Sequence, residues 1–195
     1  MRAGRAFSAW PSTLNAALVG LSAAIWVASV YLNNEILFVW TQKEEYLHWI
    51  FVPAGIKILL VMLLGWRGAF GIVLGTLPRV LEIFPGIGPG MAVLIATGAG
   101  LIPLLVLWTF SLSVGIRHPW HNLVWWHLPV LAVFSAFASS AFFNLLLLLL
   151  GLEPAGDLPE NLLLVTTSHF LGTLLLLLSS VVTVRFMRVL RSRPN

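Results

Sequence analysis

Long apolar runs occupy most of this chain, and they limit the folds that are open to it. One run begins near Leu14, and another contains the six consecutive leucines at 145–150. A helix needs about 20 consecutive apolar residues to cross the hydrocarbon core of a bilayer. The sequence therefore predicts an all-α, polytopic transmembrane bundle that forms a single domain over residues 1–195. Six spans are expected, at about 14–33, 46–66, 68–84, 89–113, 124–151 and 160–187.

The composition excludes several classes of protein. Hydrophobic residues make up 59% of the chain and charged residues 9%, whereas soluble domains carry about 25% charged residues. The net charge of +4 is explained by basic cytoplasmic loops, so nucleic acid is not an expected partner. The chain has no cysteine, which excludes disulfides, thiolate metal sites and cysteine nucleophiles. The first apolar run is longer than the 7–15 residues of a signal peptide core, so we expect it to be retained as an anchor.

Charges of opposite sign alternate between successive loops, and this alternation predicts the orientation. Arginines precede the first span, occupy positions 67 and 117, and recur from Arg185 to Arg193. The loops at 33–46 and 153–161 are acidic instead. Because cationic loops stay in the cytoplasm, both termini are expected there, with an even number of spans. The predicted location is the inner (plasma) membrane, with the lipid bilayer as partner.

Lys57 is the exception in the apolar stretch VPAGIKILLVMLLGW at 52–66. A lysine at the centre of a bilayer costs about 2.5–3.5 kcal/mol, and the centre is the worst position from which to reach an interface. We therefore expect Lys57 to face the bundle interior, a wet cavity or a carboxylate.

Other polar residues fall at a similar depth in neighbouring spans. Arg79 and Glu82 are three residues apart, on one helical face, and Glu82 is the only acid inside a predicted span apart from Glu160, the first residue of the last one. The sequence predicts one polar site in the outer half of the bundle, which has a net positive charge and would favour an anionic ligand. A wholly internal salt-bridge network is the alternative. The candidate ligand-binding residues are Lys57, Arg79, Glu82, Asn144, Thr167 and His169.

The segment HPWHNLVWWH at 118–127 contains three histidines on the cytoplasmic side. His118, His121 and His127 are weak candidates for a metal site, because zinc usually needs four ligands or three with a water. An interfacial loop of histidine and tryptophan is the alternative. No cofactor is expected, since no P-loop and no pair of membrane-buried haem ligands is present.

The stretch WIFVPAGIKILLVMLLGWRGAFGIVLG at 49–75 resembles the MASE1 family of bacterial integral membrane sensor domains. SHFLG at 168–172 resembles a signature near the end of that family, although His169 and Ser168 stand where the family usually has Asp and Gly. The resemblance implies a sensory or ligand-binding module that signals through a membrane or cytoplasmic protein partner, because the chain has no output domain after its last span. The matching positions of the first stretch are Pro53, Ala54, Gly55, Gly65, Arg67 and Gly75.

Two other functions stay open. Six spans in 195 residues also resemble the substrate-binding subunit of a vitamin-type transporter, and Ala24 and Ala28 have the small-residue spacing with which such subunits dock their transport partner. The third possibility is a membrane assembly factor or enzyme. Because no catalytic constellation can be named, we do not expect an enzyme.

Overall fold

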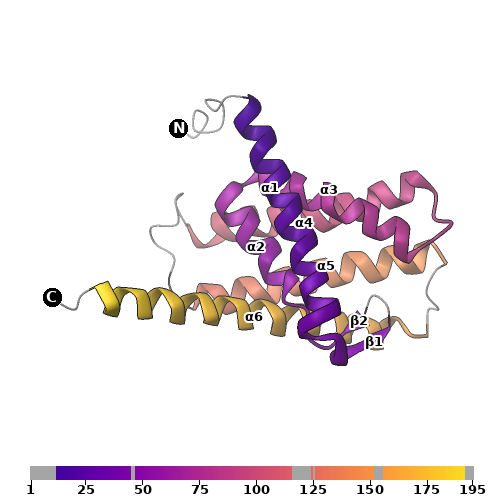
Figure 1. Ribbon diagram of the computed structural model, residues 1–195. Helices are drawn as coiled ribbons and strands as arrows, with labels where there is room; N and C mark the ends of the chain where they lie inside the picture. The colour runs from indigo at the N-terminus through magenta and orange to yellow at the C-terminus, as the bar shows by residue number, and fades with distance from the viewer. Residues whose placement is uncertain (1–11, 45–46, 116–123, 125, 152–155, 192–195) are drawn as a thin grey trace.

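The computed structural model describes residues 12–44, 47–115, 124, 126–151 and 156–191, and most of these residues are helical. The predicted all-α class is confirmed (Figure 1). A π-helical turn (Leu32–Leu37), a 3₁₀ turn (Val39–Thr41) and a small antiparallel hairpin of β1 (Gln42–Glu44) and β2 (Leu47–His48) connect the first two helices. The helices are α1 (Ser12–Tyr31), α2 (Pro53–Leu64), α3 (Trp66–Ile83), α4 (Pro89–Val114), α5 (His127–Leu149) and α6 (Leu158–Arg191).

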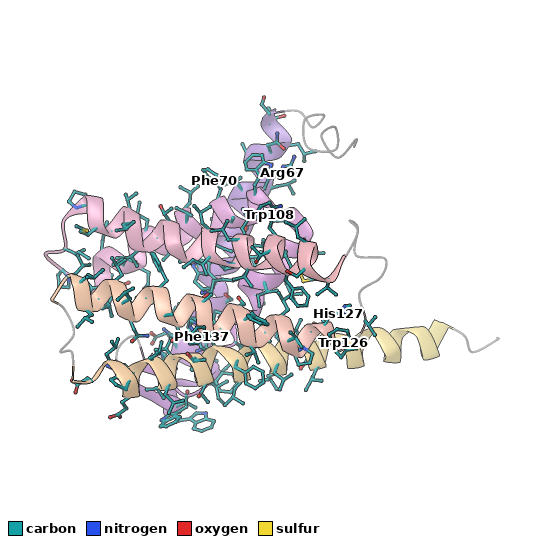
Figure 2. All side chains as sticks on the ribbon, turned by 180° about the vertical axis from the view of Figure 1, so that it is seen from behind. Arg67, Phe70, Trp108, Trp126, His127 and Phe137 are labelled. Carbon is teal, nitrogen blue, oxygen red and sulfur yellow. The ribbon has the colours of Figure 1, made fainter. Side chains whose placement is uncertain are left out.

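Four helices of the described chain are long and apolar enough to cross a membrane. They are α1 with the π-helical turn (Ser12–Leu37), α4, α5, and α6 over Leu158–Ser180. Large apolar side chains cover the outside of the molecule, among them Phe70, Trp108 and Phe137 (Figure 2). An apolar exterior of this extent is typical of a surface that contacts lipid.

The prediction of six spans is wrong, because α2 and α3 do not qualify. With 12 residues, α2 is about 18 Å long at about 1.5 Å per residue, which is well short of the hydrocarbon thickness of about 30 Å. It begins only at Pro53, a residue that fits the first turn of a helix, and it ends at Gly65, whose φ of 60° favours glycine. Helix α3 is longer, with 18 residues, but it carries three charged side chains, Arg67, Arg79 and Glu82.

Helix α2 is instead an interior helix of the protein. It contacts all five other α-helices, and seven of its 12 residues are buried. Apolar helices of about 10–14 residues are more often core helices or re-entrant segments than spans. Since only Gly65 separates α2 from α3 and the two helices pack against each other, they form a hairpin. Removing both from the list of spans therefore leaves the number of crossings even.

The start of α2 is held by two elements that lie far from it in the sequence. The backbone N–H of Phe51 donates to the carbonyl of Ser168 on α6 (3.3 Å), and Gly172 lies so close that an added Cβ would collide with the carbonyl of Phe51. On the other side, the amide oxygen of Asn33 accepts a hydrogen bond from the N–H of Val52 (3.0 Å). The stretch at 49–55 and the SHFLG stretch at 168–172 are therefore in direct contact.

Replacing Gly172 by Ala should loosen this contact and destabilise the protein by about 1–3 kcal/mol, the usual cost of overpacking a tight interior. The matched control is Gly20→Ala on α1, where an added Cβ would meet nothing within 4 Å. The stability of this variant should stay the same or rise by about 1 kcal/mol, because alanine favours the helix more than glycine does. Thermal unfolding in detergent measures both. Equal melting temperatures for the two variants would show that Gly172 is not packed tightly against the segment before α2.

Candidate functional site

A cavity of about 410 Å³ opens between the C-terminal ends of α1 and α3 and reaches the middle of the bundle. Its rim is exposed and includes Tyr31 and Glu82, whereas its inner wall is buried and includes Trp26 and Lys57. Ser139 and His169, near the middle of α5 and α6, also line it. The volume lies within the range of about 300–1,000 Å³ that is typical of small-molecule sites.

Lys57 lies in the interior, as expected from its position in the sequence. The residue is 6% exposed, and its Nζ lies 5.4 Å from the ring centroid of Trp26, in a cation–π arrangement. Within the part of the chain that the structure describes, no carboxylate and no hydrogen-bond acceptor is paired with this amine. An ammonium group with only an aromatic ring beside it is poorly compensated for the loss of water.

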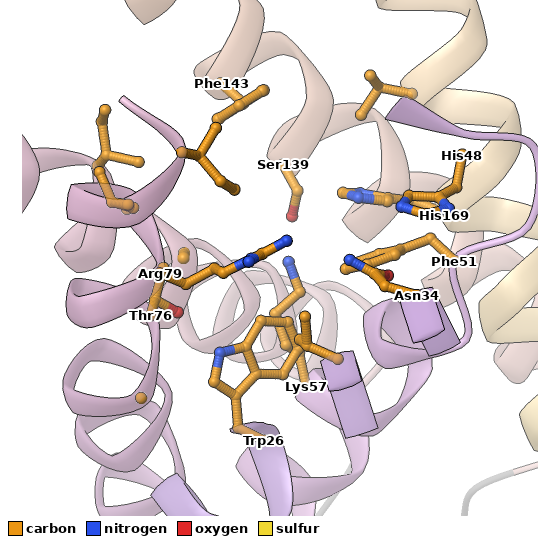
Figure 3. Close-up of a pocket in the computed structure, with 18 of the residues that line it drawn as sticks. Trp26, Asn34, His48, Phe51, Lys57, Thr76, Arg79, Ser139, Phe143 and His169 are labelled. Atoms are coloured by element: carbon orange, nitrogen blue, oxygen red, sulfur yellow. The ribbon is translucent and has the colours of Figure 1, made fainter. Parts of the chain in front are cut away.

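Glu82 is paired with Arg79 rather than with Lys57. Arg79 Nη1 donates to Glu82 Oε2 over 2.8 Å, and the two side chains are 29% and 65% exposed. This ion pair lies at the rim, where solvent weakens it. Figure 3 shows the guanidinium of Arg79 and the amine of Lys57 directed into the same part of the cavity, below Ser139. Two positive groups thus face the interior, and the one acid that neutralises Arg79 lies farther out.

Four of the six predicted site residues line this cavity: Lys57, Arg79, Glu82 and His169. Asn144 and Thr167 do not. The side-chain amide of Asn144 is buried and donates to the carbonyl of Ser140, one turn earlier in the same helix (2.9 Å). Asn144 lies on a face of α5 that is directed away from the cavity lining, and position along a helix does not predict that face.

Several lining residues carry no signal in the sequence analysis. Asn34 and Glu35 lie in the π-helical turn after α1, and His48 lies in β2. These positions belong to irregular connections, which return to the bundle and close one side of the cavity.

An aromatic stack forms the wall beside β2. The ring of Phe51 is nearly parallel to those of His48 and His169, with interplanar angles of 27° and 26° and centroid distances of 6.3 and 5.2 Å. Both ring nitrogens of His48 and Nδ1 of His169 are buried without a hydrogen-bond partner among the described residues, as is the hydroxyl of Thr76. The wall therefore offers flat apolar faces together with unsatisfied polar atoms.

Only one of the three predicted metal candidates lies among the described residues. His118 and His121 lie outside the described residues. His127 is buried at the start of α5, where its Nδ1 accepts a hydrogen bond from the N–H of Val124 (3.0 Å). This hydrogen bond gives His127 a structural role at the N-terminal end of α5. The described residues contain no group of three metal-binding side chains.

No family model, curated protein or solved structure matches this chain. The physical properties of the cavity are therefore the basis for a functional argument.

His48 gives the cavity a dependence on pH. Burial lowers the pKa of His48 from 6.5, and the positive charge of Arg79 lowers it further; the Phe38 carbonyl and Glu35 act in the opposite direction. The fold thus accommodates the neutral ring. The stability that depends on this neutral ring is fully present above pH 6.5 and is lost as the pH falls through the lower pKa of the folded state.

We expect the melting temperature of the protein to fall between about pH 7 and about pH 5, and to fall less in His48→Phe, which keeps an aromatic ring but cannot titrate. The measurement is thermal unfolding of both proteins at closely spaced pH values. Parallel curves for the two proteins would show that His48 does not contribute.

Proposed function

We propose that this chain is a multi-pass protein of the bacterial inner membrane that binds a small organic anion in the cavity and signals its occupancy to a partner protein. The observation that supports the proposal most is the amine of Lys57, which lies in the cavity wall with no acidic partner among the described residues. A buried charge of this kind costs several kcal/mol. A ligand carboxylate would supply the missing partner.

The alternative of a purely internal salt-bridge network has less support. Such a network requires Lys57 to be paired, yet the acid predicted for it, Glu82, binds Arg79 at the rim. The other acid that lines the cavity, Glu35, is exposed. The positive charge in the interior is thus free to attract an anion, and the Arg79–Glu82 pair stands where a ligand would enter.

Helix α6 is suited to connect the cavity with a partner. His169 and Ser168 on this helix line the cavity, and the helix has 34 residues in all. At about 1.5 Å per residue it is about 51 Å long, so it exceeds the hydrocarbon core of about 30 Å. Figure 1 shows its C-terminal end extending past the neighbouring helices. This role as a sensory module agrees with what the MASE1 resemblance implies.

The proposed orientation places both termini and the arginine-bearing end of α6 in the cytoplasm. The rim of the cavity then faces the extracytoplasmic side. Because the chain has no cysteine, single cysteines at Asp157 and Ser12 test this orientation: only the first should react with an impermeant thiol reagent in intact cells.

The second candidate is the substrate-binding subunit of a transporter. Ala24 and Ala28 are both exposed on α1, and α1 is the least buried of the four candidate spans. Small residues at this spacing let helices approach closely. If ATPase subunits co-purify with this chain from native membranes, and Ala24→Leu on α1 abolishes the co-purification, transport would be favoured over sensing.

Lys57→Met should strongly weaken anion binding while the protein stays folded. The loss of a charge-assisted hydrogen bond is worth about 1.5–3 kcal/mol, or about a 10- to 100-fold weaker affinity. The control is Lys43→Met in β1, which removes the only other lysine of the chain. Native mass spectrometry with an equimolar mixture of small organic acids and their amides should show acid adducts on the wild type and on the control, but not on Lys57→Met.

The melting temperature of the ligand-free protein separates the two explanations of Lys57. If the amine serves a ligand, Lys57→Met should leave this temperature unchanged or raise it, because an unpaired buried charge is removed. A clear decrease, together with unchanged acid adducts, would contradict the proposal and favour an internal network.

A further inference from the structure

We infer that the ligand is a planar aromatic monocarboxylate that carries a hydrogen-bonding group on its ring. This inference rests on the proposed function and names the chemical class that the cavity would take. It follows from three properties of the wall: where its positive charge lies, how its rings are arranged, and which of its polar atoms are unpaired.

The positive charge favours a single carboxylate at one end of the ligand. Of the two positive groups that face the interior, only Lys57 has no acidic partner among the described residues, since Arg79 is paired with Glu82. A second carboxylate on the ligand would lie against the apolar part of the wall or displace Glu82 from Arg79. The described wall therefore suits a monoanion.

The rings of the wall favour a flat body. Phe51 is stacked with His48 and His169 and is in edge contact with Trp26, at a centroid distance of 6.4 Å and an interplanar angle of 80°. Phe142 and Phe143 of α5 line the cavity as well. An aromatic ring that packs against these faces and edges gains stabilisation in addition to that from its buried area. This gain corresponds to an affinity about 2- to 10-fold higher than that of a saturated ring of similar size. A flexible aliphatic chain would fill the same space without this gain.

The unpaired polar atoms favour a polar substituent on the ring. The ring nitrogens of His48, Nδ1 of His169 and the hydroxyl of Thr76 have no hydrogen-bond partner among the described residues. Buried polar groups are nearly always paired in folded proteins. A ligand with a hydroxyl or ring nitrogen can supply such a partner, whereas a pure hydrocarbon body cannot.

Four matched probes test the inference on the intact protein in lipid nanodiscs: 6-hydroxy-2-naphthoate, 2-naphthoate, decahydronaphthalene-2-carboxylate and 2-naphthamide. We expect 2-naphthoate to bind about 2- to 10-fold more tightly than its saturated analogue, and the hydroxylated acid to bind at least about fivefold more tightly than 2-naphthoate. The amide should bind at least about tenfold more weakly than the acid. Isothermal titration calorimetry measures all four dissociation constants.

The possible results separate this inference from the proposed function. Equal affinities for 2-naphthoate and its amide would overturn the proposed anion site itself. Equal affinities for 2-naphthoate and its saturated analogue would overturn the aromatic class, while the proposed anion site would stand. The aromatic class would also be overturned if all four probes had dissociation constants above about 1 mM, the weak end of measurable affinities.

A double variant tests the polar substituent separately. His48→Phe with His169→Phe keeps both rings of the stack and removes their nitrogens, so the ratio of the dissociation constants of 2-naphthoate and its hydroxylated analogue should fall toward one. If this ratio is unchanged in a variant that still shows a cooperative thermal unfolding transition, the hydrogen-bonding part of the inference is wrong.

Discussion

The docking of α2 against its five neighbours is the contact on which the rest of the structure depends. The helix is too short to cross a bilayer, and it is stable in the interior because the extended segment before it is clamped between Asn33 and the backbone of α6. Glycines at positions 55 and 172 let the backbones approach to the distance that this clamp requires. The four longer apolar helices pack around α2, and together with α3 they present large apolar side chains outward.

The same arrangement produces the cavity. Because the start of α2 is held at the middle of α6, Lys57 faces space that α1, α3 and α5 border but do not fill. Trp26 receives the amine on its ring face, and the stack of His48, Phe51 and His169 forms the adjoining wall. The same contact therefore determines both the fold and the site. It buries α2, and it leaves the Lys57 amine beside a cavity lined by aromatic side chains.

Much of the helical framework could be predicted from the sequence, because long apolar runs and the prolines and glycines at their ends are local signals. The span assignment failed at α2 and α3. A short apolar helix such as α2 has the same composition whether lipid or protein surrounds it, and α3 carries three charged side chains. Four of the six predicted site residues line the cavity, and Asn144 does not, because depth along a helix does not fix the face on which a side chain lies. His48 and Asn34 were missed because only tertiary contacts bring the connection after α1 back to the bundle.

The central claim is that the Lys57 amine is the group that meets a ligand anion. The chain contains only two lysines, Lys43 and Lys57, so selective ¹⁵N labelling of lysine side chains gives one signal for each. Titration with 2-naphthoate, followed by NMR of these two ammonium groups, tests the claim directly. We predict a saturable shift of the Lys57 signal with the Lys43 signal unchanged, whereas a Lys57 signal that does not respond, or that responds no more than Lys43, would contradict the account.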